Sequence, residues 1–402
     1  MIDPDEKEEL AMKRQLFTEE HTAVRELARD FAHTHVAPHL ERWAATGVTD
    51  RDLFAKAGGL GLLGMDVDDK YGGGGMDDFR FNVVLNEELT RVGASAVVMN
   101  LCGFNDLIAP YLNQLLSESQ KQRWLPGLCA GTLISAIAMT EPGSGSDLAG
   151  INTTAVREGD CYRLNGAKTF ISNGILADVL IVAAKTAPSE GRNGISLFLV
   201  ESGMPGFTRG SKLRKIGLLA QDTAELFFEN VAVPAENLLG EENRGFSYLM
   251  HNLVRERLSI AVTSAASMEV ALDEALSFTR GREAFGRSIA EFQTIRFTLA
   301  ELATEVQVAR VFLDRCIAEH VEDTLDPTEA AMAKWWITEL QQRVVTRSLQ
   351  LHGGSGFMTE YRIGREFVDA RASTLYGGTT EIMKDIIGKA LVRGHITAPA
   401  LD

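Results

Sequence analysis

Cysteine is scarce in this chain, and so are clusters of metal ligands. Four cysteines occur among the 402 residues, at Cys102, Cys129, Cys161 and Cys316. None belongs to a C-x-x-C pair, so the spacing provides no disulfide framework and predicts reduced, buried thiols. His33, His35 and His39 lie close in sequence, but no carboxylate completes a ligand set. We therefore expect no metal site.

Long apolar runs and excess positive charge are lacking as well. The longest apolar run, Ile175 to Ala184, is interrupted by Asp178 and falls short of the ~20 residues of a membrane span. The net charge of −15 disfavours nucleic acid and anionic membranes as partners, because both are negatively charged. The glycine-rich stretches complete neither G-x-G-x-x-G nor G-x-x-x-x-G-K-[ST], which argues against a Rossmann or P-loop domain.

The overall composition is that of a globular protein. The chain is 45% hydrophobic and 24% charged, and it is long enough for two or three domains. Its stretch Asp3 to Glu9 is acidic, whereas secretory signals begin with basic residues and transit peptides avoid acidic ones. We therefore expect a cytoplasmic protein.

The hydrophobic pattern changes twice along the chain. Helical spacing comes first, for example in Arg80 to Arg91, and short apolar runs separated by turn clusters follow, such as Ile195 to Val200. Helical spacing then returns, and Phe292 to Cys316 alternates steps of three and four as helix bundles do. The predicted fold class is α+β, with an N-terminal helical domain (1–133), a small antiparallel β domain (134–243) and a C-terminal helix bundle (244–402).

A long helical run, Phe246 to Gly281, carries a carboxylate on its apolar face. At ~100° per residue, Glu256 shares that face with Leu249, Leu253 and Ile260. No residue three or four positions away on the helix is cationic. A desolvated carboxylate without a nearby cation has a raised pKa, as a general base near neutral pH requires. A structural ion pair with an arginine from another helix is the alternative.

Several loops rich in glycine and serine each end a regular element. They are Met139 to Asp147, Phe170 to Gly174, His352 to Gly356 and Tyr376 to Glu381. Exposed backbone N–H groups and hydroxyls suit them to bind a flat polar ligand, although each could also be a plain turn. Together they predict a ligand cleft between domains.

The motifs in these loops carry a resemblance to a known family. They are T-E-P-G-S-G-S-D (140–147), F-I-S-N-G (170–174), R-x-x-F-G with F-Q (282–293), Q-x-x-G-G-x-G-[FY] (350–357) and Y-x-G-T-x-E (376–381). In this order and spacing they resemble the acyl-CoA dehydrogenase family across nearly the whole chain, and most closely its long-chain and branched-chain members. The domain order that the resemblance implies agrees with the one predicted from hydrophobic periodicity.

The resemblance implies a bound FAD and a homotetramer. The residues that would receive the flavin are Met139, Thr140, Ser146, Phe170 and Ser172. Those that would reach the FAD of a neighbouring subunit are Arg282, Phe285 and Gln293, with Gln350, Gly353 and Gly354 holding the pyrophosphate. Thr379 and Glu381 would complete the cofactor site.

One departure from the family pattern concerns the catalytic base. Many members place a Glu directly after the Tyr of Y-x-G-T, where this chain has Gly377. The long-chain and isovaleryl-type branches carry the base in an E-R-L segment, which Glu256-Arg257-Leu258 matches. The resemblance thus implies that Glu256 removes the α-proton of an acyl-CoA thioester while hydride passes to FAD, giving the trans-2-enoyl thioester.

Substrate contacts and partners follow from the same resemblance. Ser146, Arg257 and the backbone N–H of Gly377 would contact the substrate, and a structural ion pair is the alternative role for Arg257. An electron-transferring flavoprotein would accept the electrons. The acyl chain, and the choice between CoA and acyl carrier protein, stay open. A flavin oxidase or monooxygenase of the same fold and a non-catalytic subunit of a mixed oligomer also stay open.

Overall fold

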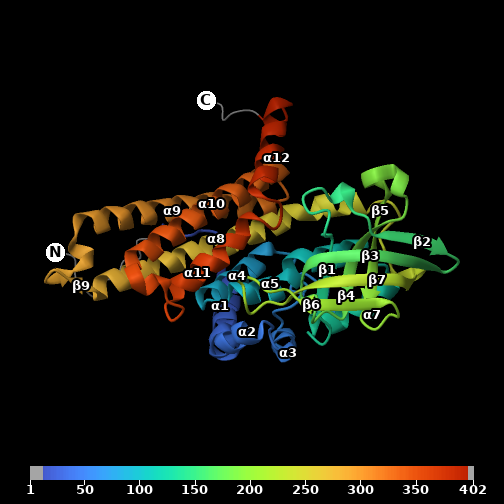
Figure 1. Ribbon diagram of the computed structural model, residues 1–402, viewed down its shortest axis with the longest axis horizontal. Coiled ribbons are helices and arrows are strands. Elements are labelled where there is room, and N and C mark those ends of the chain that lie inside the picture. Colours follow the sequence, from blue (N-terminus) through green and yellow to red (C-terminus); the bar gives the residue numbers. More distant parts are fainter. Residues whose placement is uncertain (1–11, 397–402) are drawn as a thin grey trace.

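One helix, α8 (Gly245–Gly281), runs along most of the length of the molecule (Figure 1). The structure is a computed structural model that describes residues 12–396, so the acidic stretch Asp3 to Glu9 lies outside the described residues. The 37 residues of α8 extend ~55 Å at 1.5 Å per residue. The central sheet lies near its first residues and the short hairpin of β9 (Glu283–Ala284) and β10 (Arg287–Ser288) follows its last.

Helices make up the part of the chain before the sheet. They are α1 (Glu19–Phe31), α2 (Leu40–Thr46), α3 (Arg51–Gly59), α4 (Phe79–Arg91), α5 (Ser95–Cys102), α6 (Ala109–Leu115) and α7 (Glu118–Cys129). Local sequence explains where several of them begin. Ser117 caps α7, because its hydroxyl accepts from the Gln120 N–H while the Gln120 side chain accepts from the Ser117 N–H. The predicted helix over Arg80 to Arg91 corresponds to α4.

The central sheet has eight strands, mostly antiparallel. They are β1 (Ser135–Ala138), β2 (Thr154–Glu158), β3 (Cys161–Ser172), β4 (Val179–Lys185), β5 (Ile195–Glu201), β6 (Phe207–Lys212), β7 (Thr223–Pro234) and β8 (Leu238–Leu239). Their order is β6-β7-β3-β2-β4-β5-β8, and β1 pairs with β4 in parallel. Alternate residues of β4 belong to two different buried clusters, Val179 and Ile181 to one, Leu180 and Val182 to the other. Burial on both faces explains why this stretch is apolar throughout.

The helices after the sheet form a bundle around α8. They are α9 (Gln293–Val321), α10 (Pro327–His352), α11 (Arg362–Ala370) and α12 (Thr380–Val392). Asp326 and Glu329 form a capping box at the start of α10, with Pro327 in its first turn. The predicted seam of α9 is buried from Leu302 to Cys316. Within residues 12–396, no helix is both long and apolar enough to cross a membrane.

The prediction of buried thiols is wrong for one cysteine. Cys102, Cys129 and Cys316 are buried, but Cys161 is partly exposed. Cys161 is the first residue of β3, beside the turn that connects it to β2, where the strand pair meets solvent. Its neighbours across the pair, Glu158 and Pro234, do not cover it fully.

A buried carboxylate connects the N-terminal helices to the bundle. Glu87 on α4 forms ion pairs with Arg14 at 2.8 Å, Arg25 at 2.9 Å and Arg310 of α9 at 2.8 Å. Its side chain is completely shielded from solvent. Desolvation alone would raise the pKa of Glu87, but the arginines outweigh it and lower the pKa to about 2. The group is therefore ionised throughout the neutral range.

Replacing this carboxylate should destabilise the fold. Glu87→Gln removes the counter-charge that Arg14, Arg25 and Arg310 share, although each keeps one other carboxylate. We therefore expect a loss of about 3 kcal/mol, seen as a lower urea midpoint at pH 7. Because the pKa of Glu87 is lowered, its stabilising contribution is present above the pKa of the unfolded chain and is lost as pH falls toward about 2. The difference from the parent should therefore shrink below pH 4.

The matched control is Glu301→Gln, which removes an exposed ion pair to Arg347. It should change stability by less than about 1 kcal/mol. Equal effects of the two substitutions would contradict the role assigned to Glu87.

Candidate active site

Glu256 has one carboxylate oxygen that is shut off from solvent. The residue as a whole is half-buried, but Oε2 is buried and accepts no hydrogen bond from residues 12–396. Desolvation raises the pKa of Glu256 to about 7, against the opposing effect of Arg257 and Lys334. The raised pKa predicted from the helical pattern is confirmed. A carboxyl group with a pKa near 7 can accept and release a proton at neutral pH.

The glycine loop between α11 and α12 lies against this carboxylate. Gly377 and Gly378 both have positive φ, +63° and +95°. A Cβ atom on Gly377 would lie 3.5 Å from Oε1 of Glu256 and 2.3 Å from Cδ1 of Ile260. The structure thus brings Glu256 and Gly377 together, and glycine at 377 meets both a conformational and a steric requirement.

Side chains of α10 hold this loop in place. Nζ of Lys334 donates to the carbonyl of Gly378 at 2.6 Å. The hydroxyl of Thr380 donates to Glu339 at 2.6 Å, and that of Ser373 donates to Gln341 at 2.8 Å. Sequence reasoning missed these residues. A lysine next to buried Ala333, in a helix with a strong apolar pattern, was the available signal.

The first Gly/Ser loop is built on a buried ion pair. Lys168 of β3 and Glu141 are 2.8 Å apart, and Nζ also donates to the carbonyl of Met139 at 3.0 Å. Both side chains are almost fully buried. The N–H of Thr169 donates to the carbonyl of Thr140 at 3.0 Å, which places Thr140 beside Phe170. The structure therefore brings the loop at 139–147 together with the end of β3.

Phe170 combines two unusual features. Its backbone is in the left-handed region at φ +59°, and its side chain is 68% exposed. Strained backbones of this kind cluster at ligand sites, and an exposed aromatic ring can stack on a flat ligand. Ser146 is also exposed, whereas Ser172 is half-buried at the end of β3.

Thr379 and Glu381 lie at the start of α12, directly after the glycine pair. The hydroxyl of Thr379 caps the helix by accepting from the N–H of Ile382 at 3.4 Å. Glu381 is exposed in the first turn. Its charge acts on Lys334, which faces the same loop from α10.

The remaining predicted cofactor residues lie far from Glu256. Arg282 follows Glu256 by 26 positions along α8, or ~39 Å at 1.5 Å per residue. Phe285 lies at the tip of the β9–β10 hairpin with φ +55° and a 95% exposed ring, and Gln293 begins α9. These residues occupy the end of the molecule opposite the sheet (Figure 1).

The loop after α10 lies at that far end too. The ring of His352 packs on Phe278 of α8, with centroids 4.4 Å apart, while Lys334 near the start of α10 acts on Glu256. The two helices therefore run side by side in the same direction, and Gln350, Gly353 and Gly354 end up near Arg282. The prediction that all the glycine-rich loops share one cleft is wrong within a single chain, because the length of α10 separates the last two.

Arg257 does not have the structural ion pair that was its alternative role. It is only 6% exposed, yet within residues 12–396 it lies in no ion pair shorter than 4.0 Å. Its Nε is buried and donates to no described residue. Desolvation lowers the pKa of Arg257, and the charge of Glu256 opposes that shift. A buried guanidinium in this state calls for a polar ligand.

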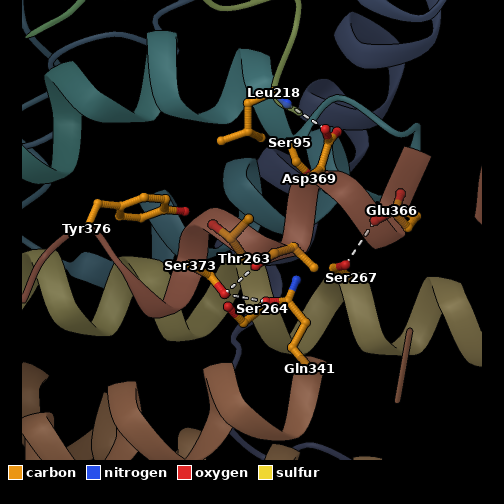
Figure 2. Close-up of a pocket in the computed structure, with 11 residues that line it drawn as sticks. Ser95, Leu218, Thr263, Ser264, Ser267, Gln341, Glu366, Asp369, Ser373 and Tyr376 are labelled. Carbon is orange, nitrogen blue, oxygen red and sulfur yellow. Dashed lines mark hydrogen bonds between the residues drawn. The ribbon is translucent and has the colours of Figure 1, made fainter. Parts of the chain in front are cut away.

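A small polar cavity lies behind Tyr376, the residue before the glycine pair (Figure 2). Asp369 accepts from the N–H of Leu218 at 2.5 Å, and Glu366 accepts from the hydroxyl of Ser267 at 2.8 Å. Desolvation raises the pKa of Asp369 to about 7. These contacts attach α11 both to the loop between β6 and β7 and to α8, and so fix the base of the glycine loop.

Family models match three consecutive parts of the chain. They are the N-terminal domain of acyl-CoA dehydrogenase over residues 18–132, its middle domain over 136–231 and its C-terminal domain over 243–392. The chain belongs to the acyl-CoA dehydrogenase family. A relative from the pig, Sus scrofa, named long-chain specific acyl-CoA dehydrogenase, mitochondrial, is 46% identical over 386 residues, which cover 94% of this chain and 88% of the relative.

Solved structures of the family superpose closely. The acyl-CoA dehydrogenase of Geobacillus kaustophilus has a TM-score of 0.92 at 49% identity and covers 94% of this chain and 99% of its own. A glutaryl-CoA dehydrogenase of Mycobacterium smegmatis in complex with FADH2 has a TM-score of 0.86 at 30% identity, covering 94% and 96%. The predicted fold class is confirmed, and so is the prediction that the protein is an enzyme of the acyl-CoA dehydrogenase family.

The contact between Gly377 and Ile260 can be measured with a double-mutant cycle. Gly377→Ala should destabilise the protein by about 2–4 kcal/mol, because an alanine at positive φ is strained and its Cβ overlaps Ile260. Adding Ile260→Ala should recover the stability lost to the overlap with Ile260, but not the stability lost to backbone strain at positive φ. Thermal unfolding of the single and double variants gives the coupling.

Gly388→Ala is the matched control. Gly388 lies within α12, and a Cβ there meets no described atom within 4 Å. This variant should be stabilised by roughly 0.5–1 kcal/mol. A Gly377→Ala variant as stable as the parent would disprove the tight approach.

Proposed function

We propose that this enzyme dehydrogenates an acyl-CoA thioester between Cα and Cβ, with Glu256 as the base. The observation that carries the proposal is the state of Glu256, whose Oε2 is buried and free of hydrogen bonds from residues 12–396 while its pKa is raised to about 7. An ionised carboxylate without a partner of its own is free to take the α-proton of a substrate. The E-R-L segment shared with the long-chain branch supports the same assignment.

The glycine loop supplies the complementary charge stabilisation. As the α-proton leaves, negative charge develops on the thioester oxygen, and a backbone N–H donor in a site with little water stabilises it. Gly377 provides such an N–H close to Glu256, and its lack of a side chain leaves space for the substrate. Arg257, which is buried without a described partner, and the exposed hydroxyl of Ser146 would contact the substrate.

The residues fit FAD, provided that two chains form each site. FAD supplies a two-electron acceptor for the hydride that leaves Cβ. The flavin would contact Met139, Thr140, Phe170 and Ser172, together with Thr379 and Glu381, which follow the glycine loop beside Glu256. At the far end, Gly353 and Gly354 have open space where a side chain would be, so their N–H groups can approach a pyrophosphate. Because ~39 Å of helix separates the two groups, Arg282, Phe285, Gln293 and Gln350 would serve the FAD of a neighbouring chain.

Self-association has support in the surface of α9. Phe297, Val308 and Val311 are 58%, 53% and 47% exposed. Several exposed apolar side chains on one helix are typical of a surface that another chain covers. We propose a homotetramer, an electron-transferring flavoprotein as acceptor, and domains at 1–133, 134–243 and 244–402. The cytoplasmic location stays a prediction, and the pig relative is mitochondrial by name.

The oxidase or monooxygenase alternative can be tested directly. Anaerobic bleaching of the bound flavin by butyryl-, octanoyl- or palmitoyl-CoA would identify the substrate class. Rapid recovery of the flavin colour in air would support the alternative, and slow recovery would support a dehydrogenase. Flavin that no thioester bleaches would contradict the proposed reaction.

Removing the base should abolish chemistry and leave the fold intact. Glu256→Gln should lose at least ~10² to 10⁴ in turnover, because the amide cannot accept the proton. In the parent, kcat/KM should fall as pH decreases below about 7, since the carboxyl group becomes protonated. The control is Asp273→Asn, an exposed position on the same helix, which should keep full activity. Near-normal turnover by Glu256→Gln would disprove the assignment.

The same variant should be more stable than the parent at high pH. A raised pKa means that Glu256 favours the folded state while it is protonated, and this contribution is lost as pH rises through about 7. Glu256→Gln carries no charge, so it should gain about 1–2 kcal/mol at pH 8.5, a figure that allows for partial exposure of the residue, and little at pH 4. Thermal unfolding across this range measures the difference.

The two-chain site predicts that cofactor and assembly depend on one another. Arg282→Ala should lower FAD occupancy and shift the protein toward smaller species in sedimentation. Arg280→Ala, an exposed arginine in the last turn of α8, is the control and should change neither. A monomer that binds one FAD per chain would disprove the assignment across the interface.

A further inference from the structure

Lys334 is a buried cation with an unusual set of neighbours. Its side chain is fully buried, and Nζ donates to the carbonyl of Gly378 at 2.6 Å. Within residues 12–396 it forms no ion pair shorter than 4.0 Å. Lys168 is equally buried, but it contacts the carboxylate of Glu141 at 2.8 Å. A hydrogen bond to a carbonyl does not neutralise the ammonium charge of Lys334. That charge therefore acts on other groups nearby.

That consequence is electrostatic and falls on Glu256. Desolvation raises the pKa of Glu256, and the charges of Arg257 and, to a smaller extent, Lys334 lower it. In turn, desolvation and Arg257 lower the pKa of Lys334 to about 8, while Glu256, Glu339 and Glu381 oppose the decrease. The ammonium thus remains mostly charged at neutral pH.

Among the residues that the structure describes, the other groups that act on Glu256 add no cation. Tyr111 on α6 and Tyr376 before the glycine pair are the tyrosines whose pKa values the charge of Glu256 raises. Desolvation is the larger cause in both cases, so both phenols stay neutral. Of the two cations, Arg257 belongs to the helix of Glu256 itself, and Lys334 alone reaches it from α10 and also contacts the glycine loop.

The hydrogen bond to Gly378 connects this charge to the loop geometry. Gly377 and Gly378 both have positive φ, and glycine has more backbone freedom than other residues, so a hydrogen bond that fixes the Gly378 carbonyl restricts the conformations open to this loop. Lys334 provides that fixed point from a helix whose own position is set by the bundle core. The same side chain therefore touches the loop on one side of the site and acts on Glu256 through its charge.

We propose that Lys334 is a positioning residue for the dehydrogenation, which holds the Gly377–Gly378 loop against Glu256 and keeps that carboxylate ionised at neutral pH. This rests on the proposed role of Glu256 as base. No bond to Lys334 forms or breaks, and its protons stay on the ammonium during turnover. The carboxylate accepts the α-proton as before.

The test compares neutral and charged replacements. Lys334→Met removes donor and charge, and Lys334→Gln removes the charge while keeping a donor. Lys334→Arg keeps the charge. In the holoenzyme, the acidic limb of kcat/KM should move upward by about 1 pH unit in the Met and Gln variants, because an opposite charge near a carboxylate shifts its pKa by that order. The limb of the Arg variant should stay near that of the parent.

A second readout reports on the loop without using activity. Hydrogen exchange of a peptide covering residues 375–383 should be at least several-fold faster in Lys334→Met than in the parent. Lys389→Met, which removes an exposed ion pair on α12, is the control and should change neither the acidic limb nor exchange within 375–379. If the Met variant does not fold, Lys334→Gln carries both measurements.

The outcomes separate this inference from the function on which it rests. Turnover by Glu256→Gln would overturn the base, whatever Lys334 does. An inactive Glu256→Gln together with an acidic limb that stays at the parent pH in Lys334→Gln and Lys334→Met would overturn the role of Lys334. An upward shift of the limb with faster exchange in 375–383 supports it, and a uniform drop in kcat with neither change marks a merely structural lysine.

Discussion

Placing a charge where water cannot reach it is the constraint that governs both the stability and the chemistry of this fold. Two carboxylates on helices meet this constraint in opposite ways. Glu87 is completely buried, and Glu256 has one buried oxygen. Glu87 has guanidinium groups at 2.8–2.9 Å and a pKa of about 2. Glu256 has no such contact among residues 12–396 and a pKa of about 7. The first is a fixed anion that connects helices, and the second is held close to the balance between its two protonation states.

This contrast shows why burial alone does not define a functional carboxylate. Both groups suffer desolvation, and the difference lies in how far away the compensating cations are held. Arg257 and Lys334 act on Glu256 without contacting it, which leaves its oxygens available to another molecule. An ion pair with either cation would have lowered the pKa of Glu256, as the arginines lower that of Glu87. The arrangement of α8, α10 and the glycine loop thus holds the compensating cations near the carboxylate without an ion pair to it.

Much of the fold was predictable because its signals are local. Hydrophobic periodicity predicted α8 to within one residue and most of α9, and the apolar run Ile195 to Val200 marked β5. The raised pKa of Glu256 was also predictable, since one helix supplies both its apolar face and its lack of cationic neighbours. The regular element expected before Met139 is the short strand β1, but its parallel pairing with β4 was not predicted, because the two strands are not neighbours in sequence.

The parts that sequence reasoning missed depend on contacts between distant segments. Lys334 and Gly378 are 44 positions apart, and Asp369 and Leu218 are 151 positions apart. No helical or strand period relates such residues. The grouping of the glycine-rich loops failed for a related reason. Each loop was recognised correctly as the end of an element, but only the direction and length of α10 determine which end of the molecule it reaches.

The closeness of Ile260 to Gly377 also restricts how such a site can change during evolution. The resemblance to the family implies two positions for the base, one on the helix and one on the loop, and the base proposed for this chain is the helical one. A Cβ at 377 would lie 2.3 Å from Cδ1 of Ile260, so a carboxylate can enter the loop only if that terminal methyl moves aside or residue 260 becomes smaller. The order of substitutions is therefore constrained, and a chain that takes the loop position first passes through a strained intermediate with two competing bases. Lineages with the base on α8 would be expected to keep a bulky residue at 260, and those with it on the loop a small one.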